Sequence, residues 1–264
     1  MPNFKNKVVW ITGASSGIGE ALAYELSNKG AKLIISARRE AELLRVKESC
    51  TYPNEVAVLP IDLAFTDTLK LAVESAILIY GHIDILVNNG GISQRSLASE
   101  TSLEVDKKLM DVNYFGSIGL TKALIPHFLE RKNGQFVTVT SLVGKFGTPY
   151  RSGYAASKHA LHGFFDALRA ELWSKGIIVT MICPGFIKTN VSINALTEKG
   201  EKLNQMDEAQ AKGMSAAKCA RKIARAIRRQ KREVYIGGKE VYGVYLKRFF
   251  PALFARIVRK AKVR

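Results

Sequence analysis

Cysteine and long apolar runs are scarce in this sequence of 264 residues. The three cysteines, Cys50, Cys183 and Cys219, form no CxxC pair and no cluster with histidine at metal-ligand spacing, so neither disulfides nor a metal site is expected. No run approaches the roughly 18 apolar residues of a transmembrane helix. Residues 1–7 lack the apolar stretch of a secretory signal. These absences indicate reduced thiols and a cytoplasmic location.

Proline is also infrequent, with 7 residues against 21 glycines, and 47% of the chain is hydrophobic. This composition excludes a disordered or fibrous chain. Acidic residues are missing mainly from the end of the chain. Residues 1–217 carry 24 Lys and Arg against 21 Asp and Glu, whereas residues 218–264 carry 16 against 2. The basic C-terminal segment favours an anionic partner, either a membrane or a nucleic acid.

Short β-branched runs alternate with longer amphipathic stretches. The runs predict strands at Val8–Thr12, Lys32–Ser36, Val56–Ile61, Ile83–Val87, Gln135–Thr140, Ile177–Ile182 and Glu233–Ile236. The stretches predict helices at about 18–29, 39–49, 66–80, 102–131, 153–175 and 215–230. No hairpin turns separate them, so the strands must be parallel. We predict an α/β fold, a doubly wound Rossmann-type sheet of about seven strands with helices on both faces.

Residues 186–214 break this pattern, because they are polar and show no clear strand. Long irregular insertions often cover active sites, so we expect a lid here. The chain shows no internal repeat and no linker. We therefore predict one catalytic domain at residues 1–240, followed by a tail at 241–264.

The first predicted strand and helix are joined by a glycine-rich turn, Gly13-Ala14-Ser15-Ser16-Gly17-Ile18-Gly19. The glycines permit a tight turn, a close approach to a pyrophosphate and close helix–strand packing, and the helix N-terminus attracts phosphate. An ordinary strand–helix turn is the alternative. As dinucleotide contacts we expect Gly13, Ser15, Ser16, Gly17, Ile18 and Gly19.

The end of the second strand bears on the choice of cofactor. It reads Ser36-Ala37-Arg38-Arg39, with no carboxylate before Glu40. A carboxylate here would hold a ribose 2′-hydroxyl, whereas arginine suits a 2′-phosphate. Arg38 therefore favours NADP(H) over NAD(H). Arg39 is as well explained by a solvated helix face.

Further motifs follow in a recognisable order. Tyr154 and Lys158 form Y-x-x-x-K on one helical face, Ser141 closes an earlier strand, and Asn113 lies in the long helical stretch before it. With the glycine turn, they resemble the short-chain dehydrogenase/reductase family, in its single-domain Tyr/Lys type, over about residues 5–237. Val8–Glu48 and the run Asn88–Leu97 are similar to the dehydrogenase/reductase member-7 group, relatives of steroid and retinal reductases.

The resemblance implies roles for particular residues. The catalytic set it implies is Asn113, Ser141, Tyr154 and Lys158. It implies further cofactor contacts at Asp62, Leu63, Asn89, Gly90, Pro184, Gly185 and Thr189, besides Tyr154 and Lys158. Gly90 stands where the family usually has alanine. Ser16 stands where many NADP-preferring members carry a basic residue, so NADP(H) preference depends on Arg38.

This residue set suits hydride transfer at a carbonyl. A free tyrosine has a pKa of about 10, and a nearby ammonium favours its phenolate. Tyr154 would exchange the proton, Lys158 would also bind the nicotinamide ribose, and Ser141 would hold the substrate oxygen. Asn113 would position a water for a proton relay. The alternative for Y-x-x-x-K alone is a surface tyrosine beside a solvated lysine.

Four other residues receive less specific interpretations. His159 and His162 lack a metal-ligand partner in the sequence and are expected in packing or at an interface. Cys183 is expected to be a buried, inert thiol. Arg95 either meets an anionic substrate group or caps its loop.

The tail combines aromatic and basic residues. Its apolar side chains recur at helical spacing at Tyr242, Leu246, Phe249, Leu253, Phe254, Ile257 and Val258. Its basic ones are Lys247, Arg248, Arg256, Arg259, Lys260 and Lys262. This pattern favours peripheral contact with an anionic bilayer. Packing on a sister subunit or the pocket mouth is the alternative, and no nucleic-acid module is readable.

Three functions stand side by side. The first is NADP(H)-dependent hydride transfer to a hydrophobic ketone or from a secondary alcohol, of steroid-, retinoid- or lipid-like character. The second is reduction of 3-oxoacyl or sphingoid-type ketones. The third is a non-enzymatic cofactor-binding scaffold or sensor. The resemblance also implies a homo-oligomer, a dimer or tetramer.

Overall fold

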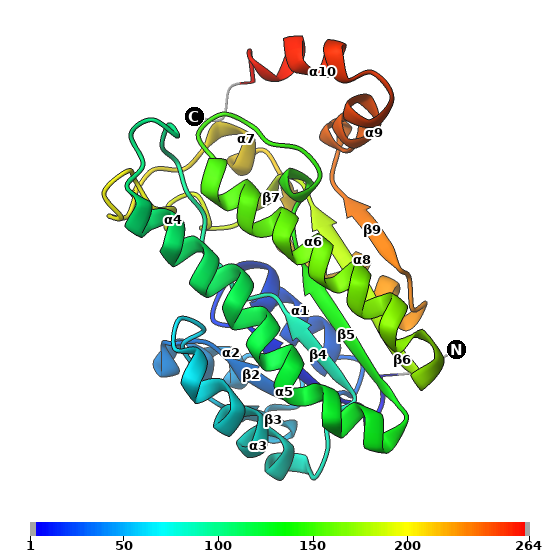
Figure 1. Cartoon of the computed structure of the whole chain (residues 1–264). Coiled ribbons are helices and arrows are strands. Elements are labelled where there is room, and N and C mark those ends of the chain that lie inside the picture. The colour runs from blue at the N-terminus through cyan, green and yellow to red at the C-terminus, as the bar shows by residue number, and fades with distance from the viewer. Residues whose placement is uncertain (1–3, 262–264) are drawn as a thin grey trace.

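A seven-stranded parallel sheet forms the centre of the molecule (Figure 1). The computed structural model describes residues 4–261. The strand order is β3-β2-β1-β4-β5-β6-β9. The strands are β1 (Val8–Thr12), β2 (Lys32–Ser36), β3 (Val56–Val58), β4 (Ile85–Asn88), β5 (Gly134–Val139), β6 (Ile177–Pro184) and β9 (Glu233–Ile236). The predicted fold class is confirmed.

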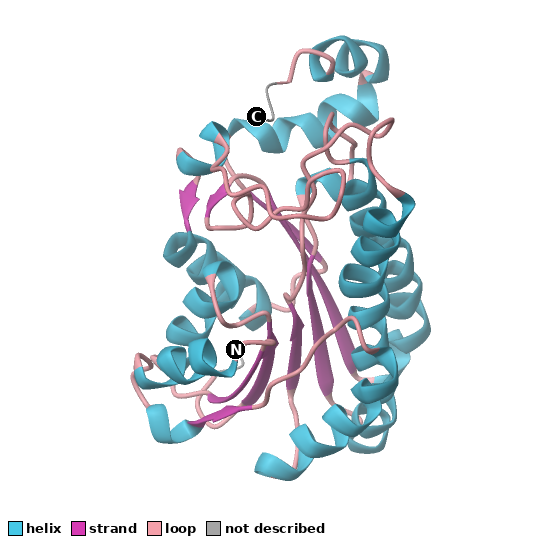
Figure 2. Cartoon of the chain, turned by 90° about the vertical axis from the view of Figure 1, so that its left-hand side faces the viewer, coloured by secondary structure: helices cyan, strands magenta, loops and turns pink. Residues whose placement is uncertain are grey.

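Helices cover both faces of this sheet (Figure 2). On one face pack α1 (Gly17–Ser27), α2 (Glu40–Glu48) and α8 (Ala216–Arg228). On the other pack α3 (Leu69–Tyr80), α5 (Gly116–Arg131) and α6 (Ser152–Leu172), with α4 (Leu103–Met110) against α6. Strand β1 shows why both layers form. Val9 and Ile11 belong to the first core, whereas Val8 and Trp10 belong to the second, because successive side chains point to opposite faces.

The long crossover predicted at 102–131 is interrupted. A π-helical turn at Asp111–Phe115 separates α4 from α5. Such turns change which way the intervening side chains point and are frequent at functional sites. Asn113 lies in this turn and is fully buried. Short 3₁₀ turns occur at Pro53–Glu55, Thr66–Thr68, Leu142–Gly144, Trp173–Lys175 and Lys239–Val241.

The segment expected to lack strands contains one short strand. β7 (Ile187–Lys188) pairs in parallel with β8 (Met214–Ser215), and α7 (Glu208–Ala211) lies between them. Leu196 also forms isolated bridges with Gln94 and Lys202. The expectation of no strand is therefore wrong. Two residues of alternation were too few to detect, and the segment is held at both ends.

The tail forms two helices, α9 (Tyr242–Phe249) and α10 (Pro251–Val258), beyond the carboxyl end of β9 (Figure 1). Pro251 opens α10, as its fixed φ favours. The ring of Phe254 packs edge-on against Phe146, with 5.2 Å between centroids. Within residues 4–261, no helix is long and apolar enough to span a bilayer. Lys262 and the residues after it lie outside the described part of the chain.

Candidate active site

A cavity of about 580 Å³ opens where the parallel strands end. This is where ligands bind in open α/β sheets. The predicted site residues that line it are Gly13, Ser15, Ser16, Gly17, Ile18, Arg38, Asp62, Leu63, Asn89, Gly90, Ser141, Tyr154, Lys158, Pro184, Gly185 and Thr189. Gly19 and Asn113 are not among its lining residues. The fold therefore brings nearly the whole predicted set together.

The glycine turn shows why small residues are needed. Gly13 has φ +65°, and a Cβ there would lie 2.6 Å from the Cα of Gly90. Asn89 clamps the same turn, because its Nδ2 donates to the carbonyls of Thr12 at 2.9 Å and Gly13 at 3.2 Å. A Cβ at Gly19 would collide with the Gly13 backbone. Gly13 thus shapes the cavity wall, and Gly19 packs helix against turn.

Positive charge lines the cavity at the end of β2. Arg38 and Arg39 are both exposed and both line the cavity. Arg45 is already engaged, since it pairs with Glu20 at 2.8 Å and Glu42 at 2.9 Å. Within residues 4–261, the side chain of Arg38 has no hydrogen bond or ion pair. Arg38 is therefore available to an anionic ligand.

Tyr154 and Lys158 lie one helical turn apart on α6. The Lys158 ammonium donates to the carbonyl of Val139 at 3.1 Å and lies 5.7 Å from the centre of the Tyr154 ring. Burial lowers the pKa of Lys158 to about 8. Burial raises the pKa of Tyr154, against the charges of Arg151 and Arg95 and a hydrogen bond from Ser141. The phenol is therefore protonated at neutral pH without ligand.

Ser141 stands at the end of β5, where it caps the 3₁₀ turn Leu142–Gly144. Its Oγ accepts from the backbone N–H of Val143 at 3.3 Å and donates to the carbonyl of Pro184 at 3.3 Å. Ser141 and Tyr154 both line the cavity. A substrate oxygen placed between them would lie beside two hydroxyl groups, and Ser141 would turn its proton from the Pro184 carbonyl to donate to it.

Asn113 is held by protein groups. Its Oδ1 accepts from the N–H of Ile92 at 2.8 Å, and its Nδ2 donates to the carbonyl of Ile92 at 3.0 Å and to Ser157 Oγ at 2.9 Å. A side chain at Gly91 would come within 2.9 Å of Asn113 Oδ1 and 3.5 Å of Lys158 Nζ. Asn113 thus fixes the loop after β4 next to the lysine.

Arg95 and Asp207 form a buried ion pair that sequence reasoning missed. Asp207 Oδ2 accepts from Arg95 Nη2 at 2.6 Å and Nε at 2.8 Å, and both side chains are at most 3% exposed. Arg95 also donates to Ser93 Oγ at 2.8 Å. The pair joins the loop after β4 to the 186–214 segment. The 112-residue separation leaves no local signal for it.

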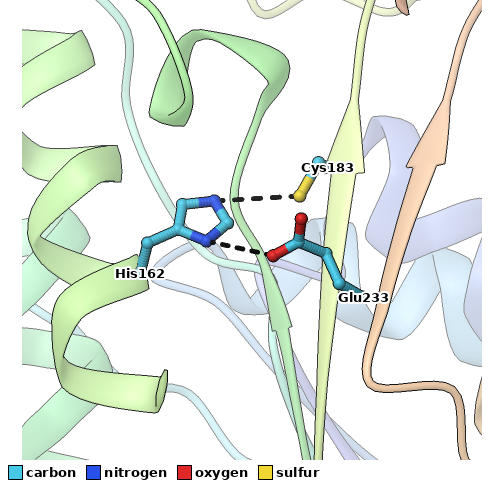
Figure 3. Close-up of side chains that lie close together, drawn as sticks. All are labelled: His162, Cys183 and Glu233. Carbon is cyan, nitrogen blue, oxygen red and sulfur yellow. Dashed lines mark hydrogen bonds and ion pairs between the residues drawn. The ribbon is translucent and has the colours of Figure 1, made fainter. Parts of the chain in front are cut away.

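Figure 3 shows three potential metal ligands together: His162 from α6, Cys183 from β6 and Glu233 from β9. The Cys183 sulfur lies 3.7 Å from His162 Nε2, and Glu233 Oε2 lies 3.6 Å from His162 Nδ1. The sequence has no Cys/His cluster at metal-ligand spacing, but the fold joins these three residues from elements distant in sequence.

The charges in this cluster cancel, as in an ordinary contact of the protein core. Lys145 Nζ lies 2.7 Å from Glu233 Oε2, so an ammonium already neutralises the carboxylate. Burial lowers the pKa of His162 to about 4 and raises that of Cys183 to about 12. Without a metal ion, the thiol is therefore protonated and the imidazole is neutral at pH 7. The protonated thiol agrees with the expectation that Cys183 is buried and inert.

Comparison with known proteins agrees with this geometry. The family model for short chain dehydrogenases matches residues 7–200. Among solved structures, a short-chain dehydrogenase from Streptomyces avermitilis superposes with a TM-score of 0.81 at 27% identity, covering 97% of this chain and 96% of that one. A short chain dehydrogenase/reductase from Burkholderia phymatum, solved in complex with NAD, gives a TM-score of 0.85 at 23% identity, covering 96% of each chain.

The chain therefore belongs to the short-chain dehydrogenase/reductase family, oxidoreductases of CH–OH and C=O groups. Human dehydrogenase/reductase SDR family member 7 is 45% identical, over 92% of this chain and 74% of that protein. A member 7-like protein of Drosophila melanogaster is 42% identical, over 98% of this chain and 81% of that protein. The resemblance inferred from the motifs is confirmed.

Proposed function

We propose that this protein transfers a hydride between NADP(H) and a hydrophobic ketone or secondary alcohol. The observation that carries the proposal is one cavity lined both by the glycine turn and by Ser141, Tyr154 and Lys158. A dinucleotide that reaches from the turn into this cavity would bring its nicotinamide to the hydroxyl pair.

The residues at the turn fit a dinucleotide. The α1 N-terminus begins at Gly17 and has no side-chain cap, so its N–H groups are free for phosphate oxygens. Unpartnered Arg38 suits the 2′-phosphate of NADP(H). NAD(H) is the alternative, since the Burkholderia relative was solved with NAD. When bound, the nicotinamide supplies or accepts the hydride.

The side chains of α6 and β5 handle the proton and the oxygen. Tyr154 donates its proton to the carbonyl oxygen in reduction and removes it from the alcohol in oxidation. Ser141 donates a hydrogen bond to the same oxygen, where negative charge develops. The Lys158 ammonium stabilises the phenolate left on Tyr154. Asn113 holds the loop beside Lys158 and supports the predicted proton relay.

The cavity walls favour an apolar substrate. The apolar side chains that line it include Ile92, Val112, Leu142, Val143, Phe146, Phe186 and Leu196. These residues come from the loop after β4, the π-helical turn, the loop after β5 and the 186–214 segment, whose lid role remains our proposal. Such walls suit steroid-, retinoid- or lipid-like ketones, with 3-oxoacyl or sphingoid-type ketones as the second candidate. A cofactor-binding scaffold without turnover is the third.

Replacing Tyr154 tests the chemistry. Purified protein should oxidise NADPH when given a panel of hydrophobic ketones. Tyr154→Phe should lower kcat at least a hundredfold, because general acid catalysis contributes roughly 10²–10⁴-fold. NADPH affinity measured by fluorescence should change little. Unchanged turnover in the variant would refute the mechanism, and tight NADPH binding without turnover by the wild type would favour the scaffold.

We also propose that the tail contacts an anionic membrane peripherally. Six of its large apolar side chains are exposed: Tyr242, Tyr245, Phe249, Phe250, Leu253 and Ile257. Lys247, Arg248, Arg256, Arg259 and Lys260 are exposed among them, and no acidic residue follows Glu240. Two copies of such a face would repel each other, whereas an anionic bilayer complements both its charge and its apolar surface.

We also propose a homo-oligomer, which the resemblance to this family implies. Helices α5 and α6 run side by side over one face of the sheet (Figure 1). Phe115 and Trp173 are exposed at the boundaries of these helices, at 44% and 78%. A self-complementary contact there would bury both side chains.

A further inference from the structure

Two buried arginines share one carboxylate in the wall of the cavity. Arg95 and Arg151 are 2% and 7% exposed, and Asp207 is 4% exposed. Asp207 Oδ2 is bonded by Arg95 at 2.6 and 2.8 Å, whereas Arg151 Nη2 lies at 3.4 Å from that same oxygen. Asp207 is thus bonded closely to Arg95 and only weakly to Arg151.

Among these three side chains, two cations face one carboxylate. Burial and the charge of Arg95 lower the pKa of Arg151 to about 10, against the favourable effect of Asp207. At neutral pH Arg151 remains a cation, so the three side chains carry one excess positive charge. Buried charges are ordinarily well paired, and a buried cation with only a long, shared ion pair is unfavourable.

Arg151 also has a donor without a partner. Its Nε is buried and makes no hydrogen bond to any described group. The guanidinium stacks on Phe186, with 5.8 Å from Cζ to the ring centre, and this contact holds it against the cavity wall. Phe186 satisfies none of its N–H donors. A group that is charged, buried and incompletely bonded beside a cavity is well suited to a ligand anion.

Its position relates this anion site to the reaction. Arg151 precedes Tyr154 by three residues at the start of α6, and both line the cavity. The charges of Arg151 and Arg95 act on the pKa of Tyr154. A substrate whose carbonyl meets Tyr154 would therefore place a nearby part of its skeleton against Arg151.

We propose that Arg151 is a specificity-determining residue that binds a carboxylate on the substrate. The preferred substrate is then an apolar ketone that carries a carboxylate, held at one end by the guanidinium while its carbonyl reaches Tyr154. Arginine suits this task because its planar fork matches a carboxylate in a bidentate contact. This inference rests on the proposed function and narrows its substrate class.

Matched probes test it: saturated oxo-carboxylic acids with the ketone at successive positions, and the methylamide of each acid. NADPH oxidation by the wild type should show a kcat/KM at least tenfold higher for the best acid than for its methylamide. Arg151→Met should raise KM for that acid at least tenfold and leave the methylamide within about twofold. Arg151→Lys should recover part of the preference, since it restores charge without the fork.

Controls separate the possible failures. Arg228→Met, on the exposed face of α8, should behave as the wild type with both probes. If Arg151→Met fails to fold, competitive inhibition of the wild type by decanoate but not by decanamide replaces it. Equal use of acids and methylamides, or equal inhibition by both, would overturn the inference while leaving the reductase intact. Absence of NADPH oxidation with every probe would instead refute the proposed function.

Discussion

The choice between NADP(H) and NAD(H) depends on single side chains at the end of β2. Arg38 and Arg39 are neighbours, both are exposed, and both line the cavity. A 2′-phosphate needs one cation within bonding distance, whereas a 2′-hydroxyl is held by a carboxylate. Ser16 contributes no charge on the other side of the cavity. The proposed preference for NADP(H) therefore depends on which arginine meets the phosphate.

We expect Arg38→Asp to raise KM for NADPH at least tenfold and to lower KM for NADH. The new carboxylate repels the 2′-phosphate and can accept a hydrogen bond from the 2′-hydroxyl. Steady-state kinetics with each cofactor at a saturating ketone concentration measures both effects. Arg39→Asp is the matched control and should change the ratio little. A larger effect at Arg39 would assign the phosphate to that residue.

At the scale of residues, a side chain's geometry could be predicted where its partners lie close to it along the sequence. Gly13 and the Tyr154–Lys158 pair could be predicted, because a local turn or helical spacing determines their geometry. Asn89 was expected by resemblance, and its bonds to Thr12 and Gly13 join residues 77 and 76 positions apart. The Arg95–Asp207 pair could not, because the partners come from loops 112 residues apart. Asn113 was found by resemblance, whereas its bonds to Ile92 and Ser157 depend on how the crossover packs.

At the scale of elements, α6, β6 and β9 meet at one buried histidine. His162 contacts Cys183 of β6 and Glu233 of β9, and Lys145 approaches the same carboxylate. Thr140 Oγ1 lies 3.1 Å from His162 Nε2. Burial is the main cause of its low pKa, about 4, and the charge of Lys145 adds to it. The contact therefore requires a neutral ring.

This contact predicts how stability changes with pH. An unfolded histidine has a pKa of about 6.5, above the folded value, so the unfolded chain takes up the proton first. The contribution of His162 is complete above pH 6.5 and declines as the pH falls toward 4, by at most roughly 3 kcal/mol. Urea unfolding at pH 7 and pH 5 should show the loss. His162→Gln should remove part of this pH dependence.

His159 provides the control, since it lies on the same helix and is exposed. His159 is the weakest of the charges that act on the pKa of His162, so His159→Gln should keep most of the wild-type pH dependence. A wild type equally stable at pH 7 and pH 5, or a His162→Gln protein with an unchanged dependence, would contradict the burial argument. Several carboxylates also titrate below pH 5, so the difference between variant and wild type is the deciding quantity.

The elements were predicted unequally well, for a physical reason. Strands β1, β2 and β9 were predicted to the residue, because buried parallel strands form compact β-branched runs. The π-helical turn at Asp111–Phe115 was missed, because a register shift of one short turn is hard to recognise within a long amphipathic stretch. The pairing of β7 with β8 likewise depends on folding of the 186–214 segment.

At the scale of the whole molecule, the excess positive charge and the exposed apolar surface coincide in one place. Helix α8 is also strongly basic, yet none of the large exposed hydrophobic residues lies on it. Within residues 4–261, the tail is the segment that combines a basic surface with several exposed large apolar side chains. It also lies close to the cavity, because Phe254 packs on Phe146 and Ala261 itself lines the cavity. If the tail binds a membrane, the cavity therefore lies close to apolar molecules dissolved in the bilayer.

Four neutral substitutions test this arrangement. We expect the combined variant Lys247→Gln, Arg248→Gln, Arg256→Gln and Arg259→Gln to lose at least tenfold in affinity for vesicles of phosphatidylcholine and phosphatidylserine, since each cation contributes about 1 kcal/mol near an anionic surface. Co-sedimentation at fixed protein concentration measures the loss.

The matched control removes four exposed cations of α8: Arg221→Gln, Lys222→Gln, Arg225→Gln and Arg228→Gln. If α8 and tail variants lose affinity equally, binding reflects total charge and the tail is no specific docking surface. If the wild type ignores anionic vesicles, the exposed aromatic side chains must be covered by protein instead.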